Sequence, residues 1–212
     1  MCNNYTMIIT FVSQKGGCGK TTSSIHFAAL LARTGSTLLI DEDPAAHALS
    51  WHKRGAERLP FGAANHAGSL RIARDYQNFV IDTKGGLEDE QIAEVYEGAD
   101  LLIIPAIVES MTLESMHKTA QALIKKDPYL ARVRVLFTQT RRTGQRKLAE
   151  ARAVVQDLGL SPLQQTIRDT EAFKDACDAG GLVHQVKNAL GKSGWLDYES
   201  AFMEAMGQRV PA

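Results

Sequence analysis

The sequence contains 212 residues, a length that suits one large domain, and its 24 basic and 24 acidic residues give a formal net charge of zero. Hydrophobic residues make up 44% and charged residues 23%, which excludes an intrinsically disordered chain and predicts that any nucleic-acid surface is a local patch. The cysteines Cys2, Cys18 and Cys177 are too few and too scattered for a disulfide framework, a zinc site or an iron–sulfur cluster. We therefore expect one domain over residues 1–212 in a reducing cytoplasm.

Short apolar runs rich in β-branched residues alternate with longer segments of helical periodicity. This alternation predicts an α/β fold, a mostly parallel, doubly wound sheet with helices on both faces. The longest runs, such as residues 101–108, fall well short of the roughly 20 residues that a membrane span needs, so no membrane association is expected. The predicted strands are Met7–Ser13, Thr37–Asp41, a weaker strand at Leu59–Ala63, Phe79–Asp82, Leu101–Pro105 and Val133–Thr138.

The predicted helices alternate with the strands and occupy Thr21–Thr34, Ala45–Arg54, Leu87–Glu97, Ser110–Lys126 and Gln145–Leu158. We expect left-handed caps at the glycines that end three of these helices, Gly35, Gly98 and Gly159. The last two helices each carry an apolar stripe that should face the core. The stripes consist of Leu113, Met116, Ala120, Leu123 and Ile124, and of Leu148, Ala151, Val155 and Leu158.

A glycine-rich segment, Ser13-Gln-Lys-Gly-Gly-Cys-Gly-Lys-Thr-Thr22, follows the first predicted strand. It fits the phosphate-loop pattern G-x-x-x-x-G-K-[ST] only if the first glycine is relaxed to Gln14 or Lys15. Its glycines let backbone N–H groups curve around a phosphate, Lys20 can reach the outer oxygens, and Thr21 can offer a hydroxyl to Mg²⁺. The alternative, a turn without a ligand, leaves the Lys20-Thr21 pair unexplained. The predicted ATP-binding residues are Lys15, Gly16, Gly17, Cys18, Gly19, Lys20, Thr21 and Thr22.

Two further predicted strands end in aspartate. Asp41 and Asp43 belong to Asp-Glu-Asp-Pro after the second strand, and Asp82 ends the strand Phe-Val-Ile-Asp. A carboxylate at the end of a buried parallel strand can serve a metal and phosphate site, although any one of them could equally cap the following helix or turn.

Together the segment K-G-G-x-G-K-T-T, the D-x-D-P box and the strand ending in Asp82 resemble the deviant Walker-A ATPases of the ParA/MinD family. The resemblance implies ATP and Mg²⁺ as cofactors and an ATP-sandwiched homodimer in which Lys15 reaches the partner's nucleotide. It assigns catalysis to Lys15, Lys20 and Asp43, the last of which orients the attacking water. It places Thr21, Asp41 and Asp82 at the metal.

The resemblance extends over about residues 8–186, including the strand Ala99–Pro105 and the segment Ile167–Phe173, but only the three nucleotide motifs are specific. Family members commonly carry D-T-P-P after Walker B, whereas this chain continues from Asp82-Thr83 with Lys84-Gly85-Gly86. The departure puts the control of hydrolysis in question more than nucleotide binding.

The phosphate loop begins near residue 14, so the chain resembles the short partition ATPases that lack an N-terminal DNA-reading domain. MinD-like members end in a basic, membrane-binding helix. Here Trp195, Tyr198, Phe202 and Met206 form an apolar stripe, but its polar neighbours are Asp197, Glu199 and Glu204 with Arg209 alone in opposition. Because anionic lipid repels such a helix, we expect it to dock on the protein body.

A basic segment spans residues 131–152, with seven Lys or Arg residues and Glu150 as its only acid. Such a local excess can bind nucleic acid without sequence preference through counterion release, although a solvated charged surface is the alternative. The best candidates for DNA binding are Arg141, Arg142, Arg146 and Lys147, because Arg132 and Arg134 fall on a predicted strand.

These observations favour a ParA-like partition ATPase. In this hypothesis ATP closes a homodimer that binds DNA non-specifically, and a ParB-like or other adaptor protein stimulates hydrolysis and release. The cycle would segregate or position plasmid or chromosomal DNA or another cargo, with the protein cytoplasmic and nucleoid-associated in its ATP state. The alternatives are a MinD-like cell-division or positioning ATPase and a metabolic P-loop synthetase. An electron-transfer ATPase would need cysteines to bind a cluster between subunits, and this sequence does not supply them. A binding module with an inactive nucleotide site is disfavoured because Lys20, Thr21, Asp43 and Asp82 are all present.

Overall fold

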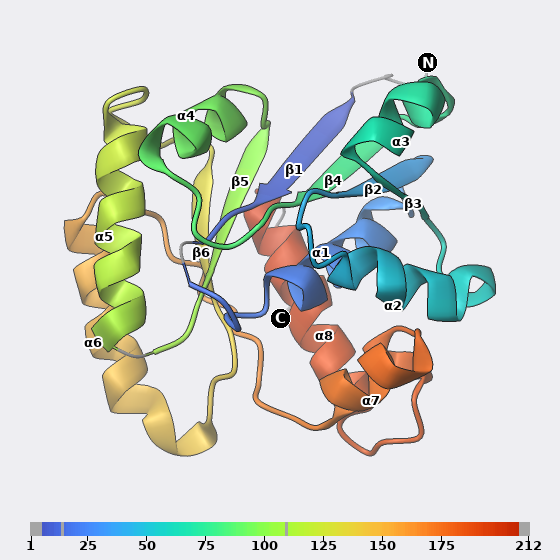
Figure 1. Ribbon diagram of the computed structural model, residues 1–212. Coiled ribbons are helices and arrows are strands. Elements are labelled where there is room, and N and C mark those ends of the chain that lie inside the picture. Colours follow the sequence, from blue (N-terminus) through green and yellow to red (C-terminus); the bar gives the residue numbers. More distant parts are fainter. Residues whose placement is uncertain (1–5, 14, 109, 208–212) are drawn as a thin grey trace.

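The structure is a computed structural model that describes residues 6–13, 15–108 and 110–207. Within these residues six strands form one parallel sheet in the order β3-β2-β4-β1-β5-β6 (Figure 1). The strands are β1 (Met7–Phe11), β2 (Thr37–Asp41), β3 (Gly62–Asn65), β4 (Asn78–Asp82), β5 (Leu101–Ala106) and β6 (Val133–Phe137). The prediction of a parallel α/β sheet is confirmed.

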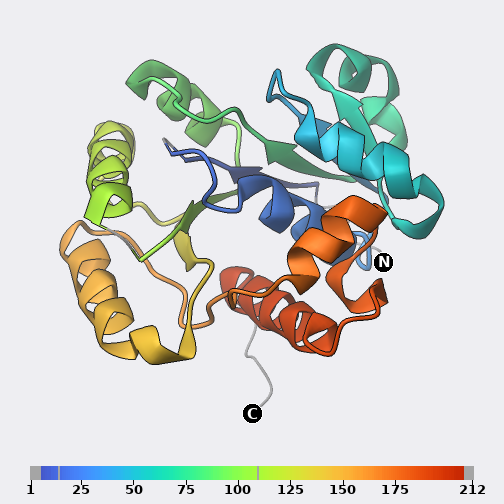
Figure 2. The same cartoon turned by 60° about the horizontal axis from the view of Figure 1, so that its bottom comes forward.

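Helices cover both faces of the sheet (Figures 1 and 2). One face carries α1 (Lys20–Leu31), α2 (His47–Gly55), α7 (Ala172–Ala179) and α8 (Gly191–Ala205), and the other carries α4 (Asp89–Glu97), α5 (Ser110–Ile124) and α6 (Gln145–Asp157). Helix α3 (His66–Ile72) packs on β3 and β2 at the sheet edge. Short 3₁₀ turns complete the chain: η1 (Ala56–Arg58), η2 (Ala73–Asp75), η3 (Arg142–Gly144) and η4 (Val183–Gln185).

The two faces have separate hydrophobic cores. Along β5, Leu101 and Ile103 belong to the core beneath α1, α2, α7 and α8, whereas Leu102 and Ile104 belong to the core beneath α4, α5 and α6. This division follows from the alternation of side chains along a strand. Side chains on both faces are therefore buried beneath helices, which is why the strands are almost continuous apolar runs in the sequence.

The aromatic core beneath α1 fixes the position of the C-terminal helices. His26 of α1 is completely buried, and its ring stacks on Tyr198 of α8 with centroids 4.5 Å apart. Its Nδ1 lies 2.7 Å from the Thr22 carbonyl, and its Nε2 accepts a hydrogen bond from the Val183 backbone. Burial lowers the pKa of His26 to about 4, so the ring is neutral near pH 7 and holds α1 against η4 and α8.

The C-terminal helix is docked on the body, as expected, because Trp195, Tyr198 and Phe202 are buried and Met206 is half-buried. Most predicted strand bounds agree within two residues, but β3 begins three residues later than expected. Helix α2 starts at His47 rather than Ala45 because Ala46 has a left-handed backbone, with φ of 52°. Helices α3 and α7 were not predicted.

Two of the three predicted glycine caps are wrong. Gly159 has φ of 77°, as expected, but Gly98 ends α4 with φ of −83°. Gly35 is not left-handed either. The core stripe of α5 is confirmed for Met116, Ala120 and Leu123, but Ile124 at the last turn is 40% exposed.

The stripe of α6 is confirmed by buried Leu148, Ala151 and Val155, with Leu158 half-buried. Cys2, Gln14 and Arg209, which the sequence interpretation uses, lie outside the described residues, as does the side chain of Leu113.

Candidate functional site

An open cleft of about 940 Å³ lies where the carboxyl ends of β1, β2 and β4 meet, the usual place for ligands in a doubly wound sheet. Its lining combines the phosphate loop with residues from the ends of β2 and β4. These are Gly16, Gly17, Gly19, Lys20, Thr21 and Thr22, followed by Asp43 and Pro44, and by Lys84 and Gly85. Three sequence motifs that lie far apart in the chain therefore face one space.

The phosphate loop takes a shape that glycine permits. Gly17 and Gly19 have φ of 77° and 84°, in the left-handed region that other residues avoid. The end of β6 braces the loop from behind, because Thr138 Oγ1 donates a hydrogen bond to the Cys18 carbonyl at 2.8 Å and Gln139 Nε2 donates to the Gly17 carbonyl at 2.7 Å. Cys18 itself is buried, and its Sγ lies 3.3 Å from the Lys15 carbonyl. Among the predicted ATP-binding residues, Cys18 thus contributes to the shape of the loop.

The first turn of α1 is joined directly to the end of β4. Thr21 Oγ1 donates a 2.7 Å hydrogen bond to Asp82 Oδ2, and Ser24 Oγ donates one of 3.1 Å to Oδ1. Lys20 is 8% exposed at the same turn, and a Cβ built on Gly85 would lie 3.6 Å from its Nζ. The structure therefore brings Lys20, Thr21 and Asp82 together.

Asp82 carries the strongest electrostatic perturbation of this group. Burial and, less strongly, the negative charge of Asp41 raise its pKa, the hydrogen bonds from Thr21 and Ser24 lower it only in part, and the net value is about 6. A cation beside Asp82 would stabilise its ionised form. The donor set is a hydroxyl and carboxylates, which are hard oxygen ligands and fit Mg²⁺ rather than a softer metal.

Asp41 lies opposite Asp82 in the β2–β4 register and is 3% exposed. Its Oδ1 accepts the Asp43 N–H and its Oδ2 accepts the Leu49 N–H, both at 3.0 Å, so it also shapes the loop that carries Asp43. Asp43 is half-buried and lines the cleft, and its Oδ1 accepts the Ala45 N–H at 2.9 Å. In the described residues no group of three or more His, Cys, Asp or Glu side chains could hold a metal. An ion here would need phosphate oxygens and water, as Mg²⁺ commonly does.

Lys15 occupies a different place from Lys20. It is half-buried, and it is not among the described residues that line the cleft. Lys84, by contrast, does line the cleft. Of these two lysines, Lys84 lines the cleft and Lys15 does not.

A smaller pocket of about 230 Å³ adjoins the phosphate loop, where Gly19 and Thr22 contribute to both spaces. Its other walls come from the end of β6, from the segment Ile167–Lys174 and from Tyr198 of α8. The sequence interpretation did not assign this pocket. The only sequence signal for it was the similarity of Ile167–Phe173 to the family, and no function was assigned to that segment.

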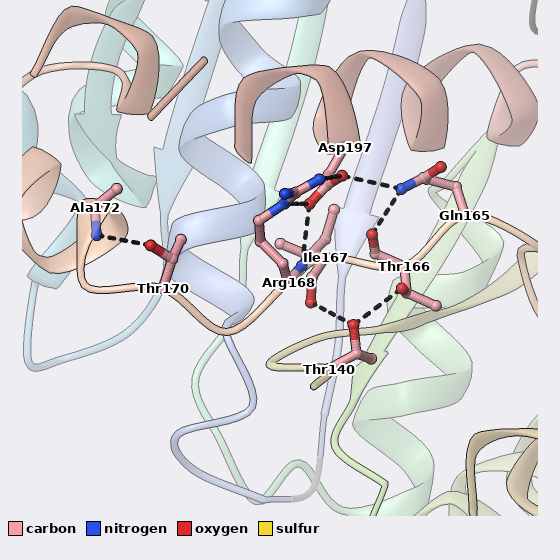
Figure 3. Close-up of polar contacts among 8 residues, drawn as sticks. All are labelled: Thr140, Gln165, Thr166, Ile167, Arg168, Thr170, Ala172 and Asp197. Carbon is pink, nitrogen blue, oxygen red and sulfur yellow. Dashed lines mark hydrogen bonds and ion pairs between the residues drawn. The ribbon is translucent and has the colours of Figure 1, made fainter. Parts of the chain in front are cut away.

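A polar network fixes the segment that forms this pocket (Figure 3). The guanidinium of Arg168 donates from Nε to Asp197 Oδ2 at 2.6 Å and from Nη2 to Oδ1 at 2.8 Å, which joins the segment to α8. The Asp197 carboxylate raises the pKa of Arg168 above its ordinary value. On the other side, Thr140 Oγ1 donates to the Ile167 carbonyl at 3.2 Å and lies 3.0 Å from Thr166 Oγ1. The pocket wall is thus held from α8 and from the segment that follows β6.

The four predicted DNA-binding residues, Arg141, Arg142, Arg146 and Lys147, are exposed on η3 and the start of α6. Two of them are paired at 2.9 Å, Arg141 with Asp169 and Arg146 with Glu150. The other basic residues of the segment bind backbone carbonyls: Arg132 that of Ala99, Arg134 those of Ala131 and Val133, and Arg152 those of Leu163 and Gln164. The structure thus distinguishes four exposed basic residues from three arginines whose guanidinium groups bind backbone carbonyls.

Within the described residues, no helix has the length and apolar character needed to cross a bilayer.

Comparisons with known proteins agree with this geometry. Residues 9–183 match the model of the CobQ/CobB/MinD/ParA nucleotide binding domain. Over 201 residues the chain is 28% identical to the "Maintenance of carboxysome distribution protein A" of Gloeobacter kilaueensis, with 92% of each chain covered. It is 25% identical over 204 residues to the protein of the same name from Halothiobacillus neapolitanus, with 91% of this chain and 93% of the relative covered.

Solved structures share the fold over nearly the whole chain. An ATP complex of a Cyanothece McdA variant superposes with a TM-score of 0.69 at 18% identity, covering 98% of this chain and 99% of that one. The MinD cell division protein of Aquifex aeolicus gives 0.72 at 16% identity, with 97% and 98% covered. Together with the phosphate loop and the aspartates that face it, the family match leads to one conclusion: this chain belongs to the CobQ/CobB/MinD/ParA family of nucleotide-binding P-loop proteins.

Proposed function

We propose that the protein is a Mg²⁺-dependent ATPase that positions a cargo by cycling between an ATP-bound homodimer and an ADP-bound monomer. The observation that carries the proposal is the direct contact of Thr21 with Asp82 beside buried Lys20, in a cleft that Asp43 also lines. A structural turn would have no need for a buried lysine, a buried carboxylate and a second carboxylate facing one open space.

Each residue has a separate task in this reaction. The loop N–H groups and Lys20 hold the β- and γ-phosphates, while Asp43 orients the attacking water. Thr21 and Asp82 would hold Mg²⁺, with Asp41 behind them, and the ion would neutralise charge on the phosphate oxygens. Lys15 acts across the dimer on the partner's nucleotide, which agrees with its absence from the lining of its own cleft. Catalysis is then mainly positioning and charge neutralisation.

The smaller pocket receives the base and ribose. It begins at Gly19 and Thr22, directly beside the phosphate loop, and its walls offer both apolar and polar groups. Phe173 and Ile167 supply apolar surface, and Gln139, Asp169 and Thr170 supply hydrogen-bonding groups. A mixed lining of this kind suits a purine ring.

The exposed cations on η3 and α6 bind DNA through its phosphates. Neutralising each phosphate releases counterions, so the affinity depends on salt and not on sequence. Closing a dimer places two such patches on one particle, and the second patch then binds at high effective concentration. The ATP-bound protein is therefore nucleoid-associated, and an adaptor on the cargo, ParB-like or otherwise, stimulates hydrolysis and release.

The names of the relatives guide our choice of cargo class. Two of them are named for the distribution of carboxysomes, and a solved structure with 18% identity is a putative plasmid partition protein of Borrelia burgdorferi bound to AMPPNP. We place a large protein assembly first and plasmid or chromosomal DNA second. A MinD-like role is compatible with the fold, but docking of the apolar stripe of α8 against the body removes it as a lipid-binding face.

The proposal is tested by following dimerisation by light scattering and DNA binding by fluorescence anisotropy with Mg-ATP, with ADP and without nucleotide. We expect dimers and tight binding to unrelated duplexes with Mg-ATP alone, with DNA release on hydrolysis. A protein that stays monomeric in Mg-ATP, or that binds DNA equally in all three conditions, would contradict the cycle.

A further inference from the structure

Asp169 belongs to two pockets at once. It lines the proposed base pocket together with Thr170 and Phe173, and it also lines a hollow of about 420 Å³ on the far side of Gln139. That second hollow is lined by Arg141 and Lys147 and by the apolar residues Val108 and Leu148. Asp169 and Gln139 therefore form the wall between a nucleotide pocket and a cationic hollow.

The carboxylate of Asp169 is turned towards the cationic side. Arg141 Nε donates a 2.9 Å hydrogen bond to its Oδ2, with the two side chains 77% and 42% exposed. Asp169 is the only carboxylate among the described residues that line this hollow. An exposed pair of this kind alters an equilibrium by only a few-fold, so a ligand can displace it.

Hydrogen bonds fix the backbone around the Arg141–Asp169 pair, so only the side chains can exchange partners. Asp169 N donates to the Thr140 carbonyl at 2.9 Å and Thr140 N donates to the Ile167 carbonyl at 3.0 Å. Arg168 is anchored on Asp197, as Figure 3 shows. The Asp169 carboxylate can therefore accept from Arg141 or from a donor in the base pocket while its main chain stays in place.

We infer that the hollow beside Arg141 and Lys147 binds a phosphodiester of DNA, and that Asp169 occupies it as a competing anion until a nucleotide fills the neighbouring pocket. An N–H or O–H of the nucleoside takes over the Asp169 carboxylate and releases Arg141 for a phosphate. Because coupling is reciprocal, DNA raises nucleotide affinity by the same factor. This coupling between nucleotide and DNA rests on the proposed function. It responds to nucleotide occupancy in a single protomer, separately from dimerisation by ATP.

The first test needs no DNA. Arg141 competes with the nucleoside for Asp169, so Arg141→Ala should bind ADP a few-fold more tightly than wild type in calorimetry. Arg142→Ala is the matched control, because it removes a neighbouring exposed arginine that no carboxylate pairs with in the described part of the chain. Equal ADP affinity in the two variants, or weaker binding by Arg141→Ala, would overturn the inference.

The second test measures binding to a short duplex at low ionic strength, with and without ADP above each variant's measured Kd. Compared with its nucleotide-free form, wild type should bind DNA a few-fold more tightly with ADP, which is still far weaker than the binding of the Mg-ATP dimer. Asp169→Asn should bind like the ADP-bound wild type and gain nothing further. Glu150→Gln is the control, because it breaks the Arg146 pair on the same face but leaves the pocket wall intact. It should bind DNA more tightly and keep the gain.

Asp169→Asn should also have no effect on DNA affinity in an Arg141→Ala background, which separates release of Arg141 from mere loss of a negative charge. If Asp169→Asn behaves like Glu150→Gln while DNA binding still depends on the four cations, the switch fails and the proposed function stands. If wild type binds no DNA in any nucleotide state, both fail.

Discussion

The phosphate cleft and the base pocket adjoin each other but are built in different ways. The cleft is formed by short motifs at the ends of β1, β2 and β4, each of which places its residues by its own strand and turn. The base pocket depends on a segment without regular structure that is held between Thr140 and Asp197. The comparison teaches that phosphate chemistry depends on short motifs that the fold brings together. Recognition of the base, and the proposed coupling to DNA, depend on long-range contacts that exist only in the folded chain.

The largest effect we expect comes from the motif-built side. Lys20→Ala removes a buried cation at the outer phosphates, and each charge-assisted hydrogen bond contributes roughly 1.5–3 kcal/mol. ATP affinity should fall by about a hundredfold or more in calorimetry, with an unchanged circular dichroism spectrum. Lys53→Ala, at an exposed position of α2, is the control and should bind ATP normally. Unchanged affinity in Lys20→Ala would refute the phosphate assignment.

The next prediction separates Asp43 from Lys15. Asp43→Ala removes the group that orients water, so turnover should fall by at least about a hundredfold while an ATP-bound dimer accumulates. Lys15→Ala removes the charge that acts on the partner's nucleotide, so it should bind ATP as a monomer. Light scattering and phosphate release in Mg-ATP distinguish the two. A dimeric Lys15→Ala protein, or normal hydrolysis by Asp43→Ala, would show that the roles are assigned wrongly.

A third prediction concerns the free-energy cost of burying the ionised Asp82 carboxylate when no ligand fills the cleft. The pKa of Asp82 is raised to about 6 in the folded protein, above its ordinary value of 3.8, so the native state binds more protons than the unfolded state between about pH 4 and 6. The free energy of unfolding must then fall as the pH rises through this window and stay lower above it. The shift corresponds to about 3 kcal/mol at most.

Asp82→Asn should therefore be more stable than wild type near pH 7 and equal to it near pH 4, as measured by urea unfolding without nucleotide. Mg-ATP should reduce the difference, because the ion stabilises the ionised carboxylate that only wild type has. A stability gap that does not change with pH would mean that burial of the charge is not its cause.

Sequence reasoning reached the two regions unequally, for a physical reason. The residues of Gly16–Thr22 are contiguous, and a strand end predicts where Asp41 and Asp82 point, so the cleft could be identified before folding was considered. The pairs Arg168–Asp197 and Arg141–Asp169 join positions 29 and 28 residues apart, and no local pattern announces them. Gly35 shows the same limit, because a glycine after a helix looks like a left-handed cap in sequence, although its backbone here is not left-handed.

The smallest effect per residue, and the one that tests the assembled region, comes from the surface cations. Changing Arg141, Arg142, Arg146 and Lys147 to Ala should weaken the binding of every duplex alike and reduce the salt slope by about 0.9 for each DNA phosphate that is no longer neutralised. Arg146 must exchange a carboxylate for a phosphate, so it should contribute less than an unpaired cation does. Changing Arg132 and Arg134 instead should leave the slope unaltered, because these guanidinium groups bind backbone carbonyls. Anisotropy over a range of salt concentrations in Mg-ATP measures both variants. Binding by the fourfold variant equal to that of wild type, or a strong preference of wild type for one duplex, would show that this face is not the DNA surface and that the positioning cycle needs a different anchor.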